Sequence, residues 1–172
     1  MSGHGKAALL LEELLLDPVA LQQAMEQLLP LMPAGYLDQV QAASDQVLAA
    51  AHNCYADAKG VPGWLRLGLL TEFVSFSLGE STTCVHQPSI GRPEPVITCA
   101  WKPRLAVCAK CEHLLRVPRG SVADRTCDCC GTVVDGVIDV DPMWCGFVGH
   151  GPMIFKYGVC ASCRDDLPEV QT

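Results

Sequence analysis

Four cysteines in the segment CAKCEHLLRVPRGSVADRTCDCCG, residues 108–131, have the types and spacing of metal ligands. They form two C-x2-C units that are separated by fifteen residues. Each unit lets two thiolates converge from a tight turn, so that two units together can place four sulfurs around Zn²⁺. The sequence therefore predicts a first zinc site made of Cys108, Cys111, Cys127 and Cys130.

The pattern C-x2-C…C-x2-C-G resembles that of the zinc-ribbon superfamily over roughly residues 104–140. The resemblance implies a small metal-held β-rich unit and no particular activity. Gly131, directly after the second pair, supplies the permissive backbone expected just past such a turn. We expect Cys129, which lies between the last two ligands, to be a bystander that points away from the metal.

A second site is suggested by Cys160 and Cys163, a lone C-x2-C unit that needs two more ligands. The best candidates are Cys84 and His86 in TTCVHQP, just before the ribbon. In this hypothesis the ribbon is nested inside an outer site that joins the two ends of the domain. One zinc ion is thus expected from the ribbon, and a second is bound if the outer set converges.

Other cysteines and histidines compete for these roles, namely Cys99, Cys145, His113 and His150. The two cysteines stand beside aromatic residues in strand-like segments, where a cysteine is usually a small buried hydrophobe. The odd total of eleven cysteines weakens a pure disulfide framework. A redox C-x2-C unit would need an adjoining βαβ pattern, which the sequence lacks.

Enzyme signatures are missing from the sequence: there is no HExxH, no zinc-deaminase motif and no glycine-rich phosphate loop. Complete four-ligand sets are typical of structural zinc rather than catalytic zinc. We therefore expect no catalytic residues and no organic cofactor, and we keep a thiol- or metal-dependent enzyme as an alternative.

The segment 102–125 is basic within an acidic protein of net charge −7. It could follow a phosphate backbone, which makes a nucleic-acid-binding regulator the second functional hypothesis. It could equally be a solvated face or a surface that meets the acidic N-terminal half. The candidate contact residues for nucleic acid or a partner are Lys102, Arg104, Lys110, Arg116, Arg119 and Arg125.

The elements that must position these groups fall into two halves, 1–83 and 84–172. In the first half, Asp17–Pro18 is typical of a helix start, and an apolar stripe from Tyr36 through Cys54 to Ala58 predicts a longer helix. That stripe also resembles a short heptad seam, so a dimerising arm is an alternative. Residues 63–78 are apolar on nearly all sides and must be covered by the zinc domain, a second subunit or a partner.

The second half has many prolines and short β-rich runs, including 104–108, 131–140 and 152–160. Together the halves predict an α+β protein, with a helical bundle over 1–83 and a β-rich zinc domain over 84–172. The ribbon, 104–140, is expected to lie within the latter.

Residues 1–20 have no cleavage motif, and acidic residues interrupt their apolar run, so we expect a cytoplasmic protein with no membrane segment. The residue usage is typical of a bacterial or phage protein. The leading hypothesis is a non-enzymatic zinc protein that acts as an interaction or assembly adaptor. Its apolar helices would bind a protein partner or a second copy.

Overall fold

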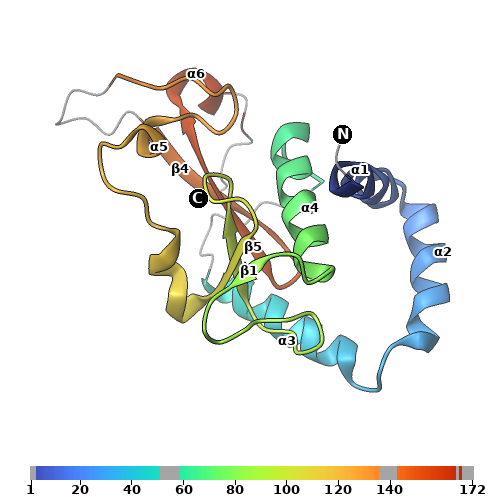
Figure 1. Cartoon of the computed structure of the whole chain (residues 1–172). Coiled ribbons are helices and arrows are strands. Elements are labelled where there is room, and N and C mark those ends of the chain that lie inside the picture. The colour runs from blue at the N-terminus through green and yellow to red at the C-terminus, as the bar shows by residue number, and fades with distance from the viewer. Residues whose placement is uncertain (1–2, 51–58, 136–142, 166, 168–172) are drawn as a thin grey trace.

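The computed structural model describes residues 3–50, 59–135, 143–165 and 167, and it confirms the predicted α+β class (Figure 1). The N-terminal half is helical, with α1 (Gly3–Leu16), α2 (Pro18–Leu28), η1 (Leu29–Leu31), α3 (Tyr36–Ala50) and α4 (Gly63–Ser77). The C-terminal half contains strands β1 (Thr82–Thr83), β2 (Val96–Cys99), β3 (Leu105–Cys108), β4 (Met143–His150) and β5 (Met153–Cys160). Between and after these strands are the short helices η2 (Ala109–Leu115), α5 (Val122–Arg125) and α6 (Ala161–Arg164).

The strands form one mixed sheet in the order β1-β3-β2-β5-β4. The outer pair β4–β5 is an antiparallel hairpin, and β5 runs parallel to β2. The next strand, β3, is antiparallel to β2 and parallel to β1. It follows that β3 and β5 run in opposite directions, so their C-terminal residues lie at opposite ends of the sheet.

Helices cover both faces of the sheet. Successive side chains of a strand point to opposite sides, so neighbouring residues of β5 pack against different helices. Phe155 of β5 packs against Gly68 of α4, where a Cβ on the glycine would lie 3.1 Å from the phenyl ring. Ile154, one residue earlier, lies on the other face and lines a cavity together with Val47 of α3. The sheet is thus the central layer between α4 and α3.

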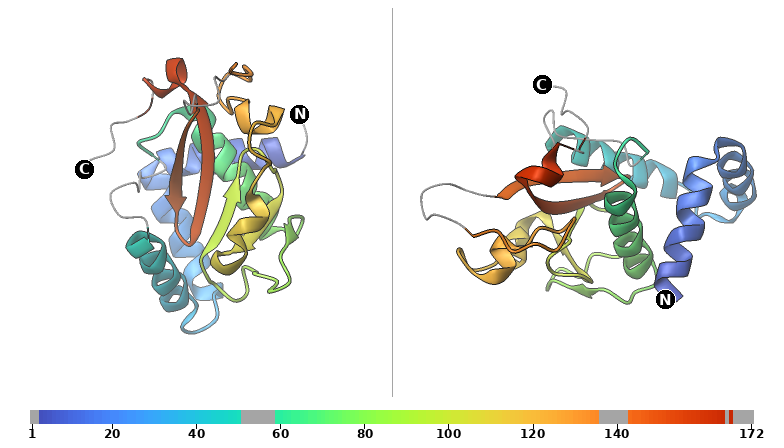
Figure 2. Two further views of the ribbon diagram at one scale, coloured as in Figure 1. Left: turned by 90° about the vertical axis from the view of Figure 1, so that its left-hand side faces the viewer. Right: turned by 90° about the horizontal axis from the view of Figure 1, so that it is seen from above.

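The apolar helix α4 is covered on one side by α1 and on the other by the sheet (Figure 2). Leu65, Leu69 and Leu70 are fully buried, which accounts for a segment that is apolar nearly all round. One continuous core joins these leucines to residues of the sheet. The division into two domains at residue 83 stays a prediction. Among the described helices, α4 included, none has the length and apolar character needed to cross a membrane.

Helix α2 begins as its sequence predicts. The Asp17 carboxylate accepts hydrogen bonds from the N–H groups of Val19 and Ala20, at 2.9 and 3.0 Å, and Pro18 takes the first helical position. None of the residues of α2 is buried. Figure 1 shows the helix standing apart from the sheet, as the outer side of an arch that leads from α1 to α3.

Two expectations fall partly outside the described residues. The longer helix starts at Tyr36 as predicted, but Cys54 and Ala58, at the end of its stripe, are not among them. The β-rich run expected over 131–140 is described only to residue 135. There it forms a single bridge, between Thr126 and Val133, rather than a strand.

Candidate metal centres

The structure gathers the eight predicted ligands into two groups of four. In each group, one ligand atom from every residue lies within 4.8 Å of the others. The first group is Cys84, His86, Cys108 and Cys111, and the second is Cys127, Cys130, Cys160 and Cys163. We call them the N-terminal tetrad and the C-terminal tetrad. Either group has the composition and the size to bind one metal ion.

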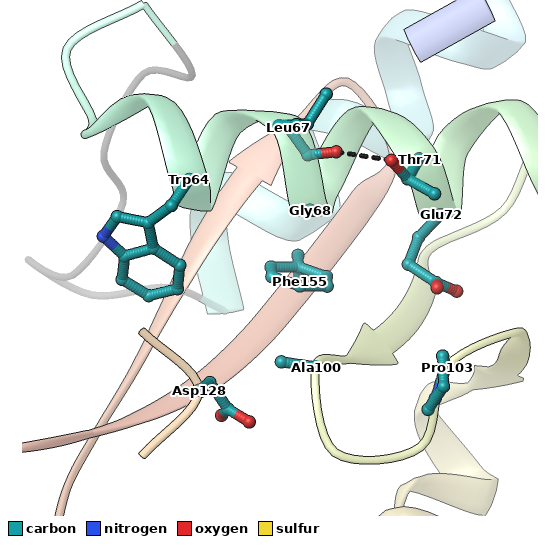
Figure 3. A pocket seen from close by; sticks show the side chains of 9 residues that line it. All are labelled: Trp64, Leu67, Gly68, Thr71, Glu72, Ala100, Pro103, Asp128 and Phe155. Carbon is teal, nitrogen blue, oxygen red and sulfur yellow. Dashed lines mark hydrogen bonds between the residues drawn. The ribbon is translucent and has the colours of Figure 1, made fainter. Parts of the chain in front are cut away.

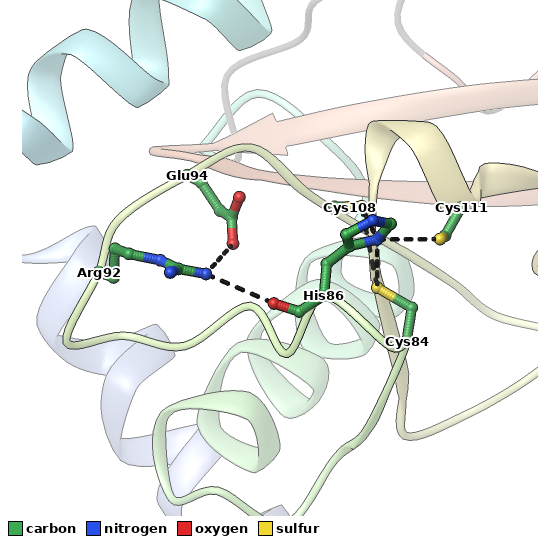
Figure 4. A network of polar contacts seen from close by, with 6 residues as sticks. All are labelled: Cys84, His86, Arg92, Glu94, Cys108 and Cys111. Carbon is green, nitrogen blue, oxygen red and sulfur yellow. Dashed lines mark hydrogen bonds and ion pairs between the residues drawn. The ribbon is translucent and has the colours of Figure 1, made fainter.

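In the N-terminal tetrad the imidazole Nδ1 of His86 is turned toward the sulfurs (Figure 4). It lies 3.3 Å from Sγ of Cys108, 3.3 Å from Sγ of Cys111 and 4.0 Å from Sγ of Cys84. The three cysteines are buried, whereas His86 is exposed. One side of the tetrad therefore faces solvent through an imidazole, and the thiols lie in the core.

In the C-terminal tetrad the thiols of Cys130 and Cys160 lie 3.9 Å apart. Cys127 and Cys160 are buried, Cys163 is half-buried and Cys130 is exposed. The N–H of Cys160 donates to Sγ of Cys127 at 3.4 Å, a bond that favours the thiolate form of the acceptor.

The distances fit zinc and exclude disulfides at these positions. Four thiolates at about 2.3 Å from a tetrahedral ion lie about 3.8 Å from one another. The separation is 3.8 Å between Cys84 and Cys108 and 3.9 Å between Cys130 and Cys160. A disulfide would need about 2.05 Å. The donor sets, three cysteines with one histidine and four cysteines, are those of structural zinc sites.

The predicted partition of the ligands is wrong, although the same eight residues converge. The nested arrangement placed Cys108 and Cys111 with Cys127 and Cys130, and the structure separates those two pairs. The reason lies in the sheet. Cys108 ends β3 opposite the start of β2, where β5 also begins, while Cys160 ends β5. Because β5 covers seven residue steps, the two ends are roughly 23 Å apart.

Parallel pairing of β1 with β3 assembles the N-terminal tetrad. Thr83 lies opposite Ala106, so the residues that follow each strand emerge at the same end of the sheet. Cys84 comes directly after β1, and Cys108 is the last residue of β3. A two-residue strand has no recognisable sequence pattern, which is why sequence reasoning missed this pairing.

The segment between Cys111 and Cys127 carries the chain from one tetrad to the other. It runs through η2 and α5 along the sheet instead of folding back as a ribbon hairpin (Figure 1). At its far end the N–H of Asp128 donates to the Gly158 carbonyl at 2.9 Å. The Gly158 N–H returns a bond to the Asp128 carboxylate at 2.7 Å. This exchange fixes the second knuckle against β5.

The turn after the second knuckle has the geometry that its glycine predicts. Gly131 has φ +72° and donates its N–H to the Cys127 carbonyl at 2.8 Å. The N–H of Cys127 in turn donates to the Thr132 carbonyl at 2.9 Å. A left-handed residue is what allows the chain to reverse between Cys130 and Thr132.

Acidity differs among thiols of the same tetrad. Burial opposes ionisation of Cys84, but hydrogen bonds from Cys108 and His86 outweigh it and lower the pKa of Cys84 to about 6. Burial, with the thiols of Cys84 and Cys108, raises the pKa of Cys111 to about 11.

The C-terminal tetrad divides in the same way. Hydrogen bonding to Thr132 lowers the pKa of Cys130 to about 6, and the bond with Cys130 raises the pKa of Cys163. So many thiols cannot ionise side by side without a cation, and a divalent ion removes that conflict.

The remaining cysteines and histidines lie outside both tetrads. Cys99 is fully buried, as expected of a small core hydrophobe. Cys145 is exposed on β4, so the expectation that it is buried is wrong. Cys129 is half-buried and is not a member of the C-terminal tetrad, as expected of a bystander. Its thiol nevertheless interacts with Cys163, so it does not point away from the tetrad. His113 and His150 belong to neither group.

The basic segment 102–125 is partly occupied by internal contacts. Lys102 donates its ammonium to the carbonyls of Leu114 and Arg116 at 2.7 and 2.8 Å. Arg125 donates to the Val134 carbonyl at 3.3 Å. The other four basic residues, Arg104, Lys110, Arg116 and Arg119, are exposed. Two of the six candidate contact residues thus hold loops in place, and binding of nucleic acid stays a prediction.

Comparison of the chain with protein-family models, with curated proteins and with solved structures finds no match.

Proposed function

We propose that this chain is a zinc protein with two structural Zn²⁺ ions, whose work is to bind another protein rather than to catalyse a reaction. The observation that supports zinc is the convergence of each tetrad within 4.8 Å. Sets of four cysteines, or of three cysteines and a histidine, suit the tetrahedral coordination of structural Zn²⁺. The thiolates require a reducing compartment, which is part of the proposal.

Saturated coordination supports a structural role for the metal. Catalytic zinc keeps an open position for water or substrate, usually beside a general base. Each tetrad here supplies four Cys or His ligands, which complete a tetrahedron. Zinc binding would instead stabilise the sheet, since structural zinc sites contribute on the order of 10 kcal/mol to folding.

The binding role rests on helix α2. An eleven-residue helix with no buried residue gains little from packing, yet its neighbourhood carries many exposed apolar side chains. These are Leu10, Leu16, Val19, Leu28, Leu29 and Leu31, with exposures between 41 and 79%. Large exposed apolar side chains on adjoining elements are typical of a protein–protein interface. The proposed docking surface is therefore α2 with the adjoining ends of α1 and η1.

Charge favours a different protein over a second copy as the occupant. Residues 3–50 contain six acidic side chains and one lysine. Two such surfaces would repel each other, whereas a surface that combines apolar and basic side chains would complement this one. We propose a partner of that chemistry.

Light scattering and reconstitution test the binding role. The purified zinc-loaded protein should remain a monomer across a hundredfold range of concentration. The double variant Val19→Asp/Leu31→Asp should lose the complex with a purified partner. The control Val122→Asp, a similarly exposed apolar residue on α5, should keep it. A dimer that the double variant abolishes would replace the partner by a second copy. A complex that survives the double variant would overturn the proposed surface.

A further inference from the structure

Glu72 is a buried carboxylate that forms no ion pair with the described residues. Its side chain comes from α4, and the residue is only 5% exposed. Both carboxylate oxygens accept from one donor, the backbone N–H of Arg104, at 3.0 and 3.1 Å. Within the described segments, no lysine or arginine side chain forms a salt bridge with it. The charge of the exposed Arg104 acts on this carboxylate from nearby, without a salt bridge. A buried charge is normally paired directly, so the carboxylate can still accept a cation from outside the chain.

A cavity of about 360 Å³ adjoins this carboxylate, between α4 and the sheet (Figure 3). Trp64 and Phe155 supply aromatic walls, and Ala100 lines the side of the cavity away from α4. The volume is near the lower end of the range of about 300–1,000 Å³ for ligand pockets. The cavity is therefore suited to a small ligand with an apolar body.

A second carboxylate, that of Asp128, lines the same cavity from the opposite wall (Figure 3). It accepts the Gly158 N–H through Oδ2 alone, which leaves Oδ1 able to accept another bond. The charges of the two carboxylates also act on one and the same thiol. Burial raises the pKa of the nearby Cys99 thiol to about 11, and the charges of Asp128 and Glu72 both add to that rise. Two acidic groups thus face one apolar space.

The chemistry of the walls favours an organic cation over a metal ion. Among the described residues, the groups close enough to share a metal are the two tetrads, and neither carboxylate belongs to them. Aromatic rings attract ammonium and guanidinium groups through their faces. An alkyl stem would fill the apolar space, and its cationic head would pair with the carboxylates.

We propose that this cavity binds a primary ammonium or guanidinium group on a short apolar stem, with Glu72 and Asp128 as the anionic recognition groups. The cation comes either from a free small amine or from a lysine or arginine side chain of a protein. Asp128 directly follows Cys127 of the C-terminal tetrad, but neither carboxylate is a member of a tetrad or of the α2 surface, so the proposal does not depend on the proposed function.

Calorimetric titration of the full-length, zinc-loaded protein tests the proposal. The probes are n-butylamine, agmatine and the neutral control n-butanol, each to about 10 mM, which exceeds a Kd of 1 mM. A lysine-containing tripeptide with blocked ends tests the second source. Saturable 1:1 binding of a cation, with none by butanol, is the expected result. Tighter binding of the tripeptide than of butylamine would assign the cation to a protein, and the reverse order would assign it to a free amine.

Two isosteric variants connect the binding to the proposed residues. Glu72→Gln should weaken cation binding at least about tenfold, since it removes one charge-assisted contact. Asp128→Asn should act in the same direction, and Glu13→Gln, an exposed change on α1, should leave the affinity unchanged. Native mass spectrometry should show two zinc ions in every variant. If Asp128→Asn loses one zinc ion, the cation affinity of Glu72→Gln is the deciding measurement. Equal binding of butanol and butylamine, no saturable binding of any cation, or an unchanged affinity in Glu72→Gln would overturn the proposal.

Discussion

Asp128 and Gly158 bond each other twice: the Asp128 N–H donates to the Gly158 carbonyl at 2.9 Å, and the Gly158 N–H donates to the Asp128 carboxylate at 2.7 Å. One partner directly follows Cys127, and the other stands two residues before Cys160. These two hydrogen bonds therefore set the distance between two ligand pairs that are about thirty residues apart in the sequence. They join the second knuckle to β5 rather than to the first knuckle.

Replacing Asp128 should weaken zinc binding at the C-terminal tetrad alone. Asp128→Ala removes the carboxylate that holds β5 against the knuckle, and the loss of such supporting contacts typically costs about 10–100-fold in metal affinity. Competition with a chromophoric chelator should show one zinc ion released more readily and the other unchanged. The control is Asp135→Ala, an exposed residue, which should release neither. Equal weakening of both zinc ions would contradict the prediction.

The ion pair between α1 and α4 offers a test with a neighbouring control. Arg66 Nε lies 2.8 Å from Glu12 Oε1, and both side chains are less than a fifth exposed. Glu12→Ala would leave the guanidinium with only its bonds to backbone carbonyls. Chemical denaturation should show a loss of about 1.5–3 kcal/mol in the free energy of unfolding. The adjacent exposed change Glu13→Ala should stay within about 0.5 kcal/mol of wild type. Equal effects of the two would refute the role of the pair.

Gly131 should be intolerant of a side chain for conformational reasons only. It has φ +72°, and a Cβ there would meet no atom within 4 Å, so the cost lies in the backbone. Gly131→Ala should cost about 1–2 kcal/mol of unfolding free energy and loosen the C-terminal zinc. Gly91→Ala is the matched control, in open space and without a positive φ. A Gly131→Ala protein as stable as the control would show that the turn relaxes.

Glu72 predicts a distinct pH dependence of stability. Burial raises the pKa of Glu72 above its ordinary value of 4.5, even though the N–H and the charge of Arg104 oppose the rise. The folded protein thus binds this proton more tightly than the unfolded chain. The associated stability is present in acid and is lost as the pH rises from about 4.5 through the raised pKa. The stability of Glu72→Gln relative to wild type should rise as the pH increases from about 4.5, and it should level off above the raised pKa. Parallel pH profiles of the two proteins would contradict this.

Local signals in the sequence predict local structure well. Asp17–Pro18 starts α2 and Tyr36 starts α3, because capping and helical period are set by neighbouring residues. Ligand identity is equally local, since a C-x2-C unit carries its own turn. The partition of the ligands depends instead on strand order. Thr82–Thr83 pairs with residues more than twenty positions away, and two threonines form too short a pattern to predict that contact.

The exposure of Cys145 has a similar origin. An aromatic neighbour and an apolar run favour a buried cysteine, but burial depends on which side of β4 is covered. Within the described sheet, β4 is the last strand, and β5 is its one neighbour in the strand order. The period of the sequence shows which side chains of a strand share a face. It does not show how much of each face is covered by other elements.

Zinc counting by native mass on two double variants tests the central claim most directly. Cys84→Ala/Cys111→Ala removes two ligands from one tetrad, so it should keep one zinc ion of two. Cys111→Ala/Cys130→Ala removes one ligand from each tetrad, so it should bind less zinc than the first variant and, if three ligands do not suffice, none. A nested arrangement would reverse the order, with zinc retained by the second variant and lost from the first. That reversal, or a folded wild-type protein without metal, would contradict the account.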